Sequence, residues 1–200
     1  MDIFDFADCN IFAQPLRDAA AKRGITERGD LARWLAQINV ESAGFKRTVE
    51  NLNYRSDTLL RVCNGRNGIN TIDDATAAVM QGARGVANAL YGGDWGVKHL
   101  GNTRPEDAFN FIGHGLIMVT GRWNHASVSA GMFGDDRLVV SPSLLTVGNI
   151  AADAAAWFWM SKHLNGVEDV TEITHKINGG ENGLRDRINL SVTLLGYTGE

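Results

Sequence analysis

Hydrophobic residues in this chain recur mostly at the three- and four-residue steps that are typical of helices packed on a core. The clearest example precedes residue 41, where the apolar face of the predicted helix consists of Leu31, Trp34, Leu35 and Ile38. The next position on that face is Glu41, where a further apolar residue would be expected. The pattern therefore predicts a buried helix with a carboxylate at its C-terminal end.

The chemistry of Glu41 follows from this position. A carboxylate at the edge of a core loses its hydration, so it either finds a partner or keeps its proton to higher pH. A carboxylic acid that is still protonated near neutral pH can act as the general acid of a glycosidase. The alternative interpretation is a helix-end charge paired with an arginine. The pattern alone leaves both interpretations open.

A second carboxylate, Glu50, follows nine residues later. On a continuous helix it would point about 180° away and lie roughly 13 Å along the axis. Gly44 interrupts the helix after Glu41, and a chain reversal there can bring Glu50 opposite Glu41. Inverting glycosidases hold two carboxyl groups roughly 6.5–9.5 Å apart, which leaves room for one water. The alternative is that Glu50 is a solvated loop residue.

Further helices account for most of the remaining chain. Together with the helix before Glu41, about seven are predicted, the others over residues 15–23, 57–62, 73–91, 149–164, 170–177 and 183–195. Residues 92–113, rich in Gly, Asn, Asp and aromatic side chains, predict a long loop. Residues 115–121 predict a short strand or extended segment, and 131–142 an irregular stretch with β-forming residues at 138–140. The predicted fold class is mainly α, with at most a small β element.

Composition and charge limit the classes of function. The chain has 200 residues, 44% hydrophobic and 21% charged, which is enough for one globular domain with two lobes around a cleft. The net charge is −4 and no basic block occurs, so nucleic acid is not an expected partner. No run of 18 apolar residues predicts a membrane span. The first twelve residues contain three aspartates and no Lys or Arg, which does not resemble a signal peptide.

Cysteine and histidine usage gives no indication of a metal site or another cofactor. Cys9 and Cys63 are far apart in the sequence, and we expect two reduced thiols packed as small apolar groups. The five histidines show neither the His-Glu-x-x-His pattern nor a close pair. We therefore expect neither a metal nor a cofactor.

Several separated stretches resemble glycoside hydrolase family 19, the chitinase and lysozyme family, in its short phage endolysin form. They occur in the family's order and span most of the chain: AQINVESAGF (36–45), Glu50, LGNTRPEDAFNFIGHGLIMVTGRWNH (100–125), AAWFWM (155–160) and INGGENGLRDR (177–187). The resemblance implies a mainly helical, lysozyme-like, two-lobed domain with a central cleft and an inverting mechanism. It implies a single catalytic domain over residues 1–200, with its core at about 30–190 and no separate wall-binding domain.

The resemblance also implies catalytic roles. The glutamate of the family's Glu-Ser motif falls on Glu41, which would be the general acid. The second glutamate of the endolysin-type members falls on Glu50, which would be the general base. The family's hydroxyl residue after Gln and an aliphatic residue falls on Thr120, which would hold the attacking water. Without the resemblance, Thr120 would be an ordinary strand threonine.

Four further residues are candidate substrate-binding or positioning residues. By resemblance, Asn124 and Asn178 would contact sugar, although Asn178-Gly179-Gly180 is first of all a helix C-cap turn. Arg187, in the family's Asp-Arg pair with Asp186, is expected to form an ion pair with Glu50; a plain salt bridge is the alternative. Trp123 is the aromatic residue that we expect to stack on a sugar ring, whereas aromatic residues such as Trp95, Phe109 and Phe111 are more often core.

Four positions depart from the family pattern. Val40 replaces His, His114 replaces Arg, Met118 replaces Gln and His125 replaces Tyr. A methionine cannot donate a hydrogen bond to an N-acetyl sugar as a glutamine can. Because both glutamates and Thr120 are kept, the departures affect specificity rather than the chemistry.

The resulting prediction is an endolysin that hydrolyses the β-1,4 glycan bond of peptidoglycan. It would be a monomer, made in the host cytoplasm without a signal peptide, and would reach the wall in the periplasm through a pore-forming holin without inserting into the membrane itself. Alternatives within the enzymes are a chitinase or a secreted bacterial wall-cutting effector. An alternative of another class is a non-catalytic glycan-binding protein.

Overall fold

The computed structural model describes residues 2–197 and is almost entirely helical. Within these residues it contains thirteen α-helices and three short 3-10 helices. Extended pairing is limited to two isolated antiparallel bridges, Val49 with His114 and His114 with Val119. The prediction of a mainly α fold is therefore confirmed. No helix of the described part is long and apolar enough to cross a membrane.

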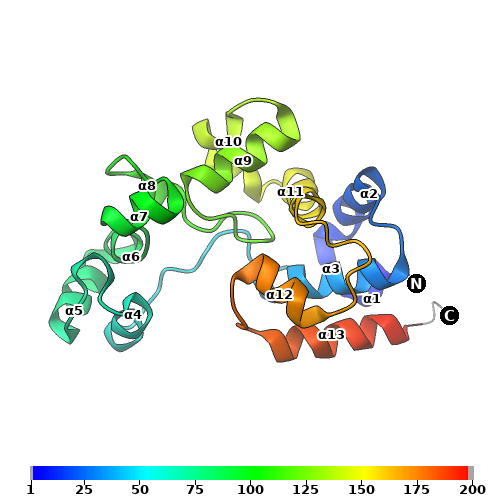
Figure 1. Ribbon diagram of the computed structural model, residues 1–200, viewed down its shortest axis with the longest axis horizontal. Helices are drawn as coiled ribbons and strands as arrows, with labels where there is room; N and C mark the ends of the chain where they lie inside the picture. Colours follow the sequence, from blue (N-terminus) through cyan, green and yellow to red (C-terminus); the bar gives the residue numbers. More distant parts are fainter. Residues whose placement is uncertain (1, 198–200) are drawn as a thin grey trace. The chain divides into compact units, whose positions relative to one another are not determined.

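The chain forms two compact units, which are described separately. The first, unit 1, consists of residues 1–48, 115–117 and 143–200, and the second, unit 2, of residues 49–114 and 118–142. The helices of unit 1 are α1 (Ile3–Phe6), η1 (Asn10–Phe12), α2 (Ala13–Arg23), α3 (Arg28–Glu41), α11 (Gly148–Ser161), α12 (Val170–Asn178) and α13 (Leu184–Gly196), with η3 (Pro142–Thr146) leading into α11. Figure 1 shows α3, α12 and α13 together in this unit, and α13 packs along α3 and α12.

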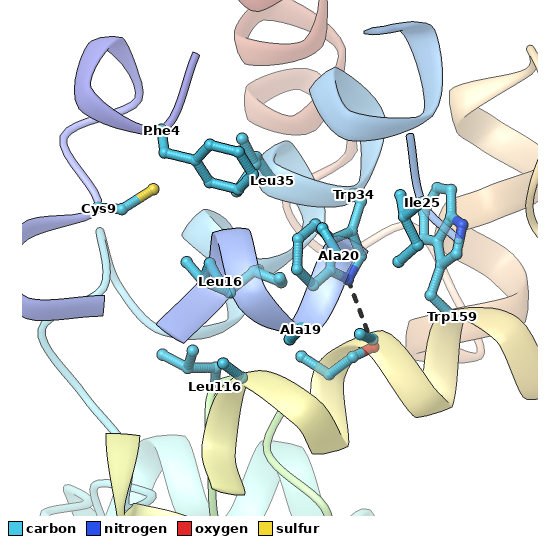
Figure 2. Close-up of a cluster of buried hydrophobic side chains, with 14 of the residues drawn as sticks. Phe4, Cys9, Leu16, Ala19, Ala20, Ile25, Trp34, Leu35, Leu116 and Trp159 are labelled. Carbon is cyan, nitrogen blue, oxygen red and sulfur yellow. Dashed lines mark hydrogen bonds between the residues drawn. The ribbon is translucent and has the colours of Figure 1, made fainter. Parts of the chain in front are cut away.

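The core of unit 1 is built around α3, as the apolar pattern predicts. Trp34, Leu35 and Ile38 are buried, and Leu31 packs on the same cluster. Figure 2 shows Leu16 and Trp159 in this core, and the Trp34 indole nitrogen donates to the Ala155 carbonyl at 3.4 Å. This packing holds the C-terminal end of α3 in a fixed position.

Unit 2 contains the helices α4 (Ser56–Cys63), η2 (Arg66–Gly68), α5 (Ile72–Met80), α6 (Gly82–Tyr91), α7 (Gly93–Leu100), α8 (Asp107–Asn110), α9 (Arg122–Phe133) and α10 (Arg137–Val140). A second apolar cluster, which includes Leu59, Val86 and Leu90, fills it. Cys63 is buried there and Cys9 in unit 1, both as free thiols, as predicted. Burial raises the pKa of Cys9 to about 12.

Three predictions of local structure are wrong. Residues 92–113 are not a long loop, because they contain α7 and α8. The stretch 131–142 is largely helical, since the buried Leu138 of α10 packs on α9 and overrides its β propensity. The predicted helix 73–91 is two helices that meet at Gln81, and the first begins earlier than predicted because Thr71 caps it through a capping box with Asp74.

Candidate functional site

The end of α3 determines how Glu41 is presented. Glu41 is the last residue of the helix, and Ser42 closes it by donating to the Ile38 carbonyl at 2.7 Å and accepting from the Phe45 amide at 2.9 Å. Ala43, Gly44 and Phe45 all have left-handed backbone angles, with φ between 52° and 76°. The predicted interruption of the helix between Glu41 and Gly44 is thus confirmed.

Glu41 accepts two hydrogen bonds, both on the same carboxylate oxygen. Its Oε1 accepts from Arg187 Nη2 at 2.6 Å and from Asn178 Nδ2 at 3.3 Å. No residue of the described chain donates to Oε2 within hydrogen-bond distance. The Glu41 side chain is 16% exposed. The carboxylate is therefore anchored through one oxygen, while the other is left for a different contact.

Arg187 pairs with Glu41, so the prediction that it pairs with Glu50 is wrong. The Arg187 side chain is 1% exposed, and beyond Glu41 it donates from Nη1 to Gln37 Oε1 at 2.5 Å and from Nε to the Asn182 carbonyl at 3.2 Å. The physical reason is that Arg187 lies on α13, which packs along α3 and points the guanidinium at the end of that helix. The arginine-paired interpretation of Glu41 therefore describes its contacts, and Glu41 is not an isolated carboxyl in an apolar environment.

Asn178 fulfils the predicted helix-end role and also reaches Glu41. It is the last residue of α12, and Gly179 follows in the left-handed conformation as the C-cap. Its side-chain amide donates to Glu41 Oε1. Asp186, which directly precedes Arg187 on α13, is exposed. We call Glu41, Asn178, Arg187 and Gln37 the Glu41 site; it lies within unit 1.

Glu50 is held in unit 2 by contacts that sequence reasoning missed. The Tyr91 hydroxyl donates to its Oε1 at 2.5 Å, and the Gly113 amide donates to its Oε2 at 3.0 Å. The backbone amide of Glu50 donates in turn to the Gly113 carbonyl at 2.8 Å. Glu50 is partly exposed, so it is a fixed carboxylate rather than a freely solvated loop residue. Burial, together with the negative charge of Glu50 and this hydrogen bond, raises the pKa of Tyr91 and keeps its phenol a donor.

A side chain at Gly113 would crowd this arrangement. A Cβ at this position would lie 3.3 Å from the Cβ of Glu50 and 3.2 Å from the Cβ of Met118. The β-bridges on either side of His114 bring the segments of Val49, His114 and Val119 together. Glu50 follows Val49 and Thr120 follows Val119, so each residue lies next to a position of unit 2 that pairs with His114.

The remaining candidates in unit 2 are arranged around Thr120. Its hydroxyl donates to the Met118 carbonyl at 2.9 Å, and the Asn124 amide donates to the Thr120 carbonyl at 2.8 Å. Trp123, on the first turn of α9, is 56% exposed. It lies against Gly101, where a Cβ would come within 2.2 Å of the indole ring. We call Glu50, Tyr91, Gly113 and Thr120 the Glu50 site, with Asn124 and Trp123 beside Thr120.

The other aromatic residues considered from the sequence make structural contacts. Phe111 is buried, and the Arg122 guanidinium lies 4.6 Å from its ring centre. Phe109 and Trp95 pair in the same way with Arg84 and Arg66, at 4.5 and 4.4 Å. Stacking partners for these three rings are thus supplied by the protein itself. Trp123 differs from them in having most of its surface exposed.

Two histidines that depart from the family pattern are buried together in unit 2. The rings of His114 and His125 meet edge to face at 5.5 Å. Their Nδ1 atoms contact the carbonyls of Ile112 at 2.8 Å and Gly121 at 2.9 Å, and no residue of the described chain bonds to Nε2 of His125. Burial lowers the pKa of both, to about 4 for His125, so both rings are neutral near pH 7.

Acid should therefore destabilise the protein through His125. In the unfolded chain this histidine binds a proton below about pH 6.5, whereas in the folded chain it does so only near pH 4. Its stabilising effect is fully present above pH 6.5 and is lost as the pH falls toward 4, by about 3 kcal/mol at most. Urea unfolding at pH 7.5 and 4.5 measures this. The difference should shrink in His125→Phe but persist in the exposed control His99→Gln; equal differences in all three proteins would contradict the expectation.

A metal centre is not indicated by the arrangement of ligands. Within residues 2–197, no three His, Cys, Asp or Glu side chains cluster in a way that could hold a metal ion.

The chain is similar to known proteins in both sequence and fold. A protein of Haemophilus influenzae described as a glycosyl hydrolase family 19 domain-containing protein is 30% identical over 181 residues, which cover 87% of this chain and 82% of the relative. A solved structure described as a chitinase C mutant superposes with a TM-score of 0.59 at 16% identity, covering 98% of this chain and 76% of the other. No protein-family model matches the chain.

The helical fold and the similarity to this relative define a glycoside hydrolase. The chain belongs to glycosyl hydrolase family 19.

Proposed function

We propose that the enzyme hydrolyses the β-1,4 glycan bonds of peptidoglycan with inversion, using Glu41 as the general acid and Glu50 as the general base. The observation that carries the proposal is that both glutamates are held by fixed donors and remain partly exposed. A catalytic carboxylate must be held in a fixed orientation and must still be reachable by the substrate. The nine-residue spacing, which resembles that of phage endolysins, also supports it.

The proposed acid step uses the free oxygen of Glu41. Because Arg187 and Asn178 both donate to Oε1, a proton on the carboxyl belongs on Oε2. Oε2 donates this proton to the glycosidic oxygen as the bond to the sugar carbon opens. The carboxylate that remains is stabilised by the adjacent guanidinium. The pair thus assists the departure of the leaving sugar without leaving a bare charge.

The proposed base step uses a water between Glu50 and Thr120. The proton of the Thr120 hydroxyl is committed to the Met118 carbonyl, so its oxygen is an acceptor. A water that donates one hydrogen to Glu50 and one to Thr120 points a lone pair away from both, toward the sugar carbon. Glu50 removes the proton as this water attacks. The Tyr91 hydroxyl and Gly113 amide keep the carboxylate oriented meanwhile.

We further propose the following cellular role. The enzyme acts as a monomeric endolysin that is made in the host cytoplasm and reaches the periplasmic wall through a holin. Its substrate is the glycan strand, contacted by Asn124, Asn178 and Trp123. The exposed Trp123 ring supports this, since a flat aromatic surface suits the apolar face of a sugar.

Digestion of purified sacculi tests the proposal. Proton NMR during the first minutes should show the α-anomer at the new reducing end, because inversion of a β-linkage yields it. Mass spectrometry should identify N-acetylmuramic acid as the reducing-end sugar. Early release of the β-anomer would overturn the inverting mechanism. Cleavage of chitin oligomers alone would indicate a chitinase, and binding without cleavage would indicate a glycan-binding protein.

A further inference from the structure

Gln37 is a buried polar side chain in the core-facing part of α3. It is 1% exposed and lies four residues before Glu41, so both side chains are on the same face of the helix. The helix could bury an apolar residue here more cheaply, because a buried amide must satisfy all its polar atoms. Burial of a glutamine here is therefore favourable only if its amide makes specific hydrogen bonds.

The orientation of the Gln37 amide is determined by its neighbours. The hydroxyl of Thr174 donates to the Val170 carbonyl at 2.7 Å, so its oxygen is an acceptor for Gln37 Nε2, at 3.2 Å. Arg187 can only donate, so the Gln37 carbonyl oxygen must face it, and Nη1 lies 2.5 Å away. Nη1 also approaches the backbone carbonyl of Gln37, at 3.4 Å. The amide is thus clamped between α12 and α13.

This clamp divides the two terminal nitrogens of Arg187. Nη1 donates to Gln37 and Nη2 donates to Glu41. An arginine next to a carboxylate often pairs instead through two nitrogens and both carboxylate oxygens. Two-point pairing would occupy Oε2 of Glu41 and would favour its ionised form more strongly. With one-point pairing, Oε2 stays available.

We propose that Gln37 is a positioning residue, which holds one nitrogen of Arg187 so that Glu41 keeps a free oxygen for the catalytic proton. The inference rests on the proposed role of Glu41 as the general acid. Gln37 itself contacts neither Glu41 nor, on this proposal, the substrate. It acts through the guanidinium.

Other charged groups around α3 have partners of their own or point to solvent. On the elements packed near it, His175 contacts Glu181 at 3.3 Å and Lys176 contacts Glu172 at 2.7 Å. Asp5 of α1 and its N-cap Asp2 both contact Arg17. On α3 itself, Arg33 contacts Asp30 at 3.6 Å. Arg185 and Asp186 on α13 are exposed. In the described part of unit 1, Arg187 is the charged residue in contact with Glu41.

Two substitutions should move the pH dependence in opposite directions. Gln37→Met removes the acceptor for Nη1, so Arg187 can turn both nitrogens to Glu41, and the alkaline limb of kcat/KM should shift to lower pH by about one unit. Gln37→Glu is isosteric and attracts Arg187 with a negative charge, which also repels an ionised Glu41. The alkaline limb should then shift to higher pH by about one unit.

A second readout does not depend on activity. The carboxyl carbon of Glu41 can be followed by 13C NMR in the full-length protein, and its signal is assigned by its absence from Glu41→Gln. It should titrate at lower pH in Gln37→Met and at higher pH in Gln37→Glu. His175→Gln is the matched control, because it replaces an exposed histidine of α12 that contacts Glu181 rather than Arg187 or Glu41, and it should leave both measurements unchanged.

The outcomes separate this inference from the proposed function. If Gln37 has a purely structural role, both variants will have a lower kcat or melting temperature while the alkaline limb of kcat/KM stays at the wild-type pH, and that result would overturn the inference. A shift of the alkaline limb in the same direction in both variants would also overturn it. If Glu41→Gln retains wild-type activity, the proposed function itself fails. If Glu41→Gln is inactive and neither Gln37 variant shifts, only the inference fails.

Discussion

Replacing Glu41 with Gln should lower kcat for glycan hydrolysis by about 10²–10⁴-fold, the usual contribution of a general acid. Gln keeps the size of the side chain, and its carbonyl oxygen can still accept from Arg187 and Asn178. The substitution therefore removes the transferable proton and little else. KM should change much less than kcat, because the interaction that is lost belongs to the transition state. Release of reducing ends from purified sacculi measures the effect.

The nature of the leaving group provides the control for Glu41. A 2,4-dinitrophenyl group departs without protonation, so the variant should hydrolyse a dinitrophenyl glycoside of an N-acetylglucosamine oligomer at close to the wild-type rate. Glu27→Gln, at the other end of α3, should behave as wild type on both substrates. Equal losses of Glu41→Gln on the natural and the activated substrate would show that Glu41 is not the acid.

Replacing Glu50 with Gln should also lower kcat by about 10²–10⁴-fold, because the attacking water loses its base. The fold around the site should persist, since the Gln carbonyl can accept from the Gly113 amide while its NH2 group donates to the Tyr91 oxygen. Here the loss should be the same for natural and dinitrophenyl substrates. The opposite response of the two variants to the leaving group distinguishes the base from the acid.

An external nucleophile provides the control for Glu50. Azide needs no deprotonation, so adding it to Glu50→Ala should restore turnover of a dinitrophenyl substrate and yield an α-glycosyl azide, with inverted configuration. Asp57→Asn, an exposed carboxylate in the same unit, should lose no activity. A β-glycosyl azide, or wild-type turnover by Glu50→Gln, would contradict the role of Glu50.

Glu41 could be singled out from the sequence by a local signal, whereas Glu50 was singled out only by its spacing and by the family resemblance. Glu41 interrupts an apolar face, and the break after it coincides with a glycine. The helix ends at Gly24 and Gly179 were predictable for the same reason, since left-handed C-caps favour glycine within one or two positions. These features depend on residues that are close together in the chain.

The errors arose where tertiary contacts override local preference. Asn102 holds the segment between α7 and α9 by donating to the Tyr91 carbonyl and accepting from the Arg122 amide, both at 3.0 Å. The buried Asp107 adds an ion pair with Arg122. Such contacts organise a Gly- and Asn-rich stretch that reads as a loop. From the sequence, Tyr91 was predicted only as the last residue of a helix. No residue near it in the sequence indicates that its hydroxyl contacts Glu50.

The sequence by itself determined that the protein is mainly helical, that α3 carries Glu41 at its end, and which family motifs are present, because helix periodicity and capping act over a few residues. Only the tertiary structure decided which groups hold each carboxylate. Arg187 and Glu41 are 146 residues apart, and Tyr91 and Glu50 are 41 apart. Their pairing follows from how whole helices pack, and helix packing depends on the entire core rather than on any short pattern.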